Sequence, residues 1–148
     1  MKKYELIITD KIIYYGRTLY RIKALKDFGD IKIGYFGGYV ESEDNLSQED
    51  NCWVYEAAKV FCNAKLYGNG KVYDHAEVFN EAQVYDNAEL YHNVEISGNA
   101  KVYGNAKVTG NVKIPSHALI NENIKITNQI DLEKYLNKQR LIEAICNL

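Results

Sequence analysis

The chain repeats one six-residue pattern, which is plainest in Ala100-Lys101-Val102-Tyr103-Gly104-Asn105 and in the next copy, Ala106-Lys107-Val108-Thr109-Gly110-Asn111. The pattern recurs thirteen times without a gap between Cys52 and Gln129. Its first position is small or apolar in every copy, and its third position is always Val, Leu or Ile. A short fixed period of this regularity indicates a repeat architecture.

Each copy has the pattern of a short strand followed by a corner. The first and third residues are apolar and the second is usually Lys, Glu or Gln, as in a strand with one buried face. The fifth and sixth residues are often Gly-Asn or Asp-Asn, which adopt turn conformations at little cost. Three strands and three corners would close a triangular coil of 18 residues. We therefore predict an all-β chain with a single-stranded parallel β-helix of about four coils.

Residues 18 positions apart should then stack along the axis of the coils. One corner column is Asn at every step, which suits a ladder of side-chain amides, and it contains Asn51, Asn69, Asn87, Asn105 and Asn123. This column supports the 18-residue coil independently of the apolar positions.

The repeat resembles that of the hexapeptide-repeat family, the left-handed parallel β-helix of the trimeric LpxA-like superfamily. The resemblance covers about half of the chain and implies a left-handed coil and a homotrimer. The fourth position departs from the family, because it is Tyr or Phe in each of the first seven copies. The segment from Leu19 to Trp53 resembles the leader of short bacterial and prophage repeat proteins that carry the name transferase.

The flanking segments are predicted to cover the ends of the β-helix. Residues 1–50 should form a β-hairpin and capping segment, residues 51–129 the β-helix, and residues 130–148 an amphipathic helix. Gly37-Gly38 is expected to make a tight turn over the first coil, and Asp131 is expected to be the N-cap of the helix. The helix should lie over the last coil or against a neighbouring chain, because an open coil end exposes unpaired backbone groups.

The composition sets limits on partners and location. The net charge of -2 over 148 residues gives no electrostatic attraction to duplex nucleic acid or to an anionic membrane. Met1-Lys2-Lys3 leads into a strand-like run instead of an apolar signal segment, so we expect a cytoplasmic protein. The three cysteines are widely spaced and form neither a disulfide framework nor a zinc motif. No metal or cofactor is expected.

The fourth-position aromatic residues are the first candidate site. At 18-residue spacing they form three columns, namely Tyr55, Tyr73 and Tyr91; Phe61 and Phe79; and Tyr67, Tyr85 and Tyr103. Contiguous aromatic surface on a small protein usually marks a contact site. One interpretation is self-contact in a trimer. The other is that a column receives a partner protein or stacks on a nucleobase.

A polar corner is the second and weaker candidate. Glu56, Asp74 and His92 should stack on one corner, with His75 beside them. Two imidazoles and two carboxylates could bind a divalent metal or move a proton. The simpler interpretation is a solvated corner whose polar groups satisfy one another.

Two functions stay open. The family resemblance implies an acyltransferase that uses coenzyme A or an acyl carrier protein, and His92 and His117 would then be the candidate bases. However, the thirteen copies run without an interrupting loop that could build a substrate pocket, so no catalytic residue is expected. We favour a non-catalytic binding or scaffold protein. One form of that role is a phage- or prophage-encoded inhibitor that occupies a host defence protein or sequesters a nucleotide-type ligand.

Overall fold

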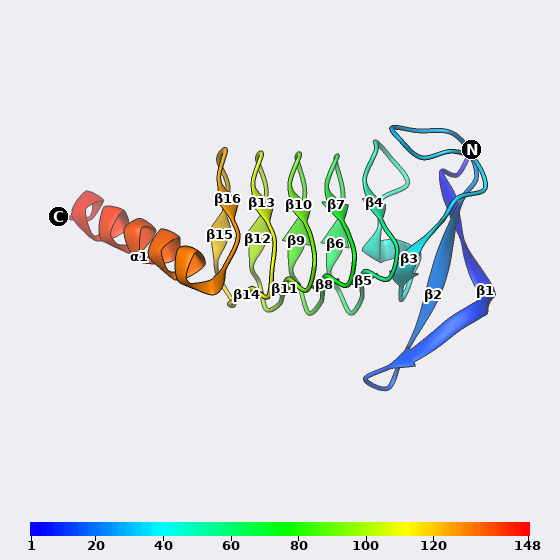
Figure 1. Cartoon of the computed structure of the whole chain (residues 1–148), viewed down its shortest axis with the longest axis horizontal. Helices are drawn as coiled ribbons and strands as arrows, with labels where there is room; N and C mark the ends of the chain where they lie inside the picture. The colour runs from blue at the N-terminus through cyan, green and yellow to red at the C-terminus, as the bar shows by residue number, and fades with distance from the viewer.

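The computed structural model describes residues 1–148 and shows a row of parallel coils with a hairpin at one end and a helix at the other (Figure 1). Three longer strands come first: β1 (Tyr4–Tyr14), β2 (Arg17–Ala24) and β3 (Phe36–Val40). A short 3-10 helix, η1 (Glu43–Asn45), precedes the repeats, and α1 (Gln129–Cys146) follows them. The repeats supply thirteen two-residue strands: β4 (Trp53–Val54), β5 (Lys59–Val60), β6 (Lys65–Leu66), β7 (Lys71–Val72), β8 (Glu77–Val78), β9 (Gln83–Val84), β10 (Glu89–Leu90), β11 (Glu95–Ile96), β12 (Lys101–Val102), β13 (Lys107–Val108), β14 (Lys113–Ile114), β15 (Leu119–Ile120) and β16 (Lys125–Ile126).

The coils are in register at the predicted spacing. Glu89 in β10 pairs in parallel with Lys71 in β7 and with Lys107 in β13, and the other two faces repeat this pattern. The third-position aliphatic residues are buried in every coil and form one continuous core. The Asn column is present in part, since the Asn87 side-chain amide donates to Asn105 Oδ1 at 3.2 Å. The all-β solenoid predicted from the period of six is therefore confirmed.

The β-helix has five coils, one more than the sequence pattern suggested, because it begins before the first recognisable repeat. Val40 in β3 pairs in parallel with Val60, and Leu46 forms a parallel bridge with Leu66. These two residues occupy the inward position of an additional coil that β4 completes. Their partners lie 20 positions away because two extra residues lengthen the corner before β4, which hides this coil from a search for a strict period.

Gly37-Gly38 was predicted to make a tight turn, and this prediction is wrong. Both glycines lie inside β3, which pairs with β2 on one side and with β5 on the other. A Cβ on Gly38 would meet the Ala58 carbonyl oxygen at 2.4 Å, and one on Gly37 would meet the Val54 carbonyl oxygen at 2.5 Å. Glycine is required at both positions because β3 lies too close to the Val54 and Ala58 backbone for any side chain.

The predicted hairpin is formed by β1 and β2, which pair antiparallel through a turn at Tyr15-Gly16. Because β2 pairs with β3 and β3 pairs with β5, the hairpin continues one face of the β-helix as a seven-stranded sheet. Figure 1 shows β1 and β2 extending from the coils at the N-terminal end. The hairpin thus adds strands to the sheet of one face.

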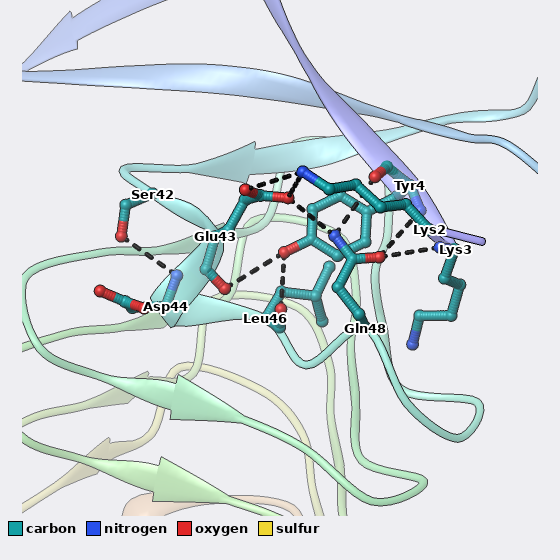
Figure 2. A network of polar contacts seen from close by, with 8 residues as sticks. All are labelled: Lys2, Lys3, Tyr4, Ser42, Glu43, Asp44, Leu46 and Gln48. Carbon is teal, nitrogen blue, oxygen red and sulfur yellow. Dashed lines mark hydrogen bonds and ion pairs between the residues drawn. The ribbon is translucent and has the colours of Figure 1, made fainter.

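A polar network ties the N-terminus to the first coil (Figure 2). The Tyr4 hydroxyl donates to the Leu46 carbonyl oxygen at 2.6 Å, and Gln48 Oε1 accepts from the Lys3 and Tyr4 backbone N–H groups at 2.8 and 3.2 Å. Lys2 and Glu43 add an exposed ion pair at 2.9 Å. Burial of Tyr4 raises the pKa of its phenol. The hydroxyl therefore stays protonated and keeps donating to Leu46 over the whole physiological range.

The C-terminal helix exists, but two details differ from prediction. Its N-cap is Asn128, whose Oδ1 accepts from the Asp131 backbone N–H at 2.9 Å, so Asp131 lies inside the first turn. Only the first turns pack on the last coil, through the buried Leu132 and Leu136. From residue 140 onward the helix is exposed and projects away from the coils (Figure 1). No helix of the structure combines the length and the apolar character that crossing a membrane requires.

Candidate functional site

The three aromatic columns are present as stacked rings. The ring centroids lie 4.2 Å apart for Tyr55 and Tyr73 and 4.5 Å apart for Tyr73 and Tyr91. The other neighbouring pairs lie 4.8 to 5.3 Å apart, namely Tyr67–Tyr85, Tyr85–Tyr103 and Phe61–Phe79. All five pairs are nearly parallel, with interplanar angles of 18° or less. The 18-residue coil spacing produces this stacking, because each ring sits one strand spacing above the previous one.

Stacking limits what the columns can bind. Each inner ring has both faces covered by its neighbours, so a column presents ring edges to solvent and free faces only at its ends. A nucleobase that stacks needs a free face, and the sides of the columns offer none. The exposed edges and hydroxyls instead suit contact with a side-chain surface of a protein.

Two of the columns are tied to the N-terminal segment. Phe61 is 4% exposed and packs edge-on against Tyr14 of the hairpin at 5.7 Å. The Tyr55 hydroxyl bonds to Asp30 Oδ1 at 2.8 Å. Burial, followed by the hydrogen bond to Asp30, raises the pKa of Tyr55. These two columns help to hold the N-terminal segment on the first coils.

The Tyr67, Tyr85 and Tyr103 column is the one with no such cover from the hairpin, and we call it the free column. The Tyr67 hydroxyl bonds to Gln83 Oε1 at 2.9 Å, and the Tyr103 hydroxyl accepts from the Asn121 side-chain amide at 3.0 Å. The Tyr85 hydroxyl has no hydrogen-bond partner in the chain. Partial burial raises the pKa of Tyr67 and of Tyr85, so both hydroxyls stay neutral, and only that of Tyr85 is free to donate.

The polar corner behaves as a solvated structural corner. Glu56, Asp74 and His92 all have positive φ, at 55°, 59° and 57°, as expected for residues stacked at one corner. Asp74 Oδ2 accepts from the His92 backbone N–H at 2.9 Å, and the His75 backbone N–H donates to the His92 carbonyl oxygen at the same distance. No group of three His, Cys, Asp or Glu side chains is placed to hold a metal ion. The Asp74 carboxylate is already used to satisfy the backbone of the next coil.

The two candidate bases lie on different corners. His92 follows β10 and His117 follows β14, and these strands belong to different faces of the β-helix. Both imidazoles are exposed, and neither makes a hydrogen bond within the chain. A general base is usually oriented by a second polar group, which neither histidine has here. The structure therefore does not unite them in one site.

His117 lines an open groove of about 450 Å³ between the last coil and α1. The groove also contains Tyr103 at the end of the free column, Ser116, Glu122 and Arg140. The groove could not be predicted from the sequence, because its position depends on how the helix leaves the last coil. Nothing in the sequence marks Arg140 as a functional residue, since it lies outside the repeats in an exposed helical segment.

No family model matches the chain, but it is similar to part of a known protein. The uncharacterized acetyltransferase YdcK of Escherichia coli (strain K12) is 35% identical to this chain over 63 residues. The match covers 38% of this chain and 19% of the relative, so the chain spans about a fifth of the length of the curated relative it matches. Together with the β-solenoid, this likeness agrees with the resemblance to hexapeptide-repeat proteins.

Proposed function

We propose that this chain is a non-catalytic binding protein that uses the free column of Tyr67, Tyr85 and Tyr103 to contact a partner protein. The observation that carries this proposal is a row of three stacked, half-buried tyrosines with one unpaired hydroxyl, at Tyr85. Tyrosine is enriched at binding hot spots, because it offers a large rigid apolar area with a polar tip. The uninterrupted coils hold these rings in place without any loop that must order on binding.

A protein fits the column better than a nucleotide-type ligand does. The stacked rings leave no inner face on which a base could insert, so sequestration of a nucleotide finds no support in the column. The leader's resemblance to prophage repeat proteins suggests a host protein as the partner, and inhibition of that host protein as the consequence. A homotrimer, which the family resemblance implies, is compatible with this role only if the free column stays outside the subunit interface.

The test is recovery of partners from a bacterial lysate by wild type and by a Tyr67→Thr/Tyr85→Thr/Tyr103→Thr variant. Threonine occupies the same repeat position natively at Thr109 and Thr127, so the coil geometry tolerates it. We expect the variant to recover at least tenfold less of a specific partner, since each hot-spot truncation costs about 2 kcal/mol or more of binding free energy. The matched control is Tyr73→Thr/Tyr91→Thr on another column, which should retain that partner. Equal recovery by all three proteins would contradict the proposal.

Acetyl or acyl transfer is the second candidate, and two observations favour it. One is the acetyltransferase name of the relative, and the other is the groove that His117 and Arg140 both line. In this candidate His117 would serve as the base, and Arg140 would offer a positive charge to the phosphates of coenzyme A.

Thermal unfolding in millimolar acetyl-CoA tests this candidate directly. A bound ligand at 100 times its dissociation constant stabilises the folded state by about 2.7 kcal/mol, which shifts the midpoint by several degrees. The binding proposal predicts no shift for wild type. A shift that disappears in Arg140→Gln, but not in the exposed control Lys138→Gln, would favour acyl transfer instead.

A further inference from the structure

A buried amine and a buried thiol touch at the base of the first coil, away from the columns and the groove. Lys3 is 1% exposed and Cys52 is fully buried, and Lys3 Nζ lies 3.3 Å from Cys52 Sγ. A lysine is almost never fully buried without an ionic partner. No carboxylate forms an ion pair with Lys3, so the thiol and backbone oxygens are its only polar neighbours.

The amine is held in a fixed position against the sulfur. Lys3 Nζ donates to the carbonyl oxygens of Glu49, Asp50 and Cys52 at 3.1, 3.2 and 2.9 Å. Lys3 Nζ also donates to Cys52 Sγ at 3.3 Å. The thiol in turn donates to the carbonyl oxygens of Ser47 and Glu49 at 3.5 and 3.6 Å, so the sulfur is held in place as well. Burial lowers the pKa of Lys3 and raises the pKa of Cys52, which shifts both groups toward their uncharged forms.

We propose that Lys3 and Cys52 form an oxidation-dependent covalent cross-link in which one oxygen atom bridges Nζ and Sγ. Dioxygen is the oxidant. One of its oxygen atoms is inserted between nitrogen and sulfur, and the other leaves as water with the thiol hydrogen and one amine hydrogen. Sulfur and nitrogen each give up two electrons, which accounts for the four electrons that dioxygen accepts. Four equivalents of a monothiol reverse the reaction and restore the thiol, the amine and one water.

The position of the Lys3–Cys52 pair allows dioxygen to reach it and allows the bridge to stabilise the fold. Lys3 directly follows two exposed residues, Met1 and Lys2, and exposed segments open locally more easily than the core does. A molecule as small as dioxygen can therefore reach the pair during such openings. Once formed, the bridge joins the N-terminal segment to the first coil across the same junction as the network in Figure 2. Like a disulfide, it constrains the unfolded chain and stabilises the fold.

The experiment uses the full chain with Cys62→Ser and Cys146→Ser, which leaves Cys52 as the only thiol. After incubation in air-saturated buffer, we expect the intact mass to gain one oxygen and lose two hydrogens. Peptide mapping should then show the Lys3 and Cys52 peptides joined. Dithiothreitol should reverse the mass change and lower the unfolding midpoint of the oxidised sample, and an anaerobic sample should show neither effect.

Two variants test whether Cys52 Sγ and Lys3 Nζ are the atoms that the cross-link joins. Cys52→Ala fits its site, because alanine occupies this repeat position in most copies, and Lys3→Met keeps the length of the side chain without its amine. Neither variant should acquire the mass change. The proposal is overturned if the oxidised chain gains only oxygen on sulfur, if no joined peptide is found, or if Lys3→Met gains the same mass. Mapping of the parent chain decides the question even if a variant fails to fold.

Discussion

Asn45→Ala is expected to lower the free energy of unfolding by about 4 kcal/mol, because one buried side chain satisfies four backbone groups. Asn45 Oδ1 accepts from the N–H groups of Glu41 and Ser42 at 3.1 and 2.9 Å. Its amide donates to the carbonyl oxygens of Cys62 and Ala64 at 3.0 and 2.9 Å. Alanine leaves these groups without their partner at a position where the Asn45 side chain is fully buried.

Urea denaturation monitored by far-UV circular dichroism measures this effect. Asn123→Ala is the matched control, because Asn123 is exposed and its side chain makes no hydrogen bond, so its loss should cost less than about 0.5 kcal/mol. An Asn45→Ala midpoint equal to that of wild type would mean that the additional first coil does not form as described.

Gly38→Ala is expected to destabilise the fold by about 3 kcal/mol or more, because the added methyl group meets backbone. Its Cβ would lie 2.4 Å from the Ala58 carbonyl oxygen and 2.7 Å from Val54 Cγ1. The oxygen accepts from the Tyr39 backbone N–H, so it cannot move without breaking the pairing between the first two coils. The hairpin and β3 should then separate from the β-helix.

Gly70→Ala provides the comparison for Gly38→Ala. Gly70 holds the first repeat position, where most copies have alanine, and its Cβ would first meet Leu66 Cδ1, the end of a flexible side chain. We expect Gly70→Ala to change the free energy of unfolding, measured by urea denaturation, by no more than about 1 kcal/mol. Equal stability of the two variants would show that β3 does not pack against the coils as closely as the structure indicates.

Much of this fold could be predicted from the sequence, because the alternation of apolar and polar residues in each repeat indicates which side chains are buried. The inward position is Val, Leu or Ile in all thirteen copies, so no other register can bury the apolar residues. The aromatic columns follow from the same spacing. The additional coil could not be predicted from this spacing, since Val40 and Leu46 are separated from the repeats by a longer corner and by polar residues.

The candidate site was predictable only in part. Residue spacing placed Tyr67, Tyr85 and Tyr103 in one column, but it could not show that stacking covers their faces. The contact between Lys3 and Cys52 joins residues 49 positions apart through an irregular loop, and no repeat predicts such a contact. The groove beside His117 depends on the exit angle of α1 from the last coil.

Photo-crosslinking tests the binding surface most directly. The photoreactive residue benzoylphenylalanine would replace Tyr85 in one protein and Tyr73 in another, and both would be irradiated in the same bacterial lysate. If the free column contacts a partner, the probe at position 85 captures one specific protein that the probe at position 73 does not. Capture of only a second copy of this chain, or of nothing at all, would contradict that role for the column.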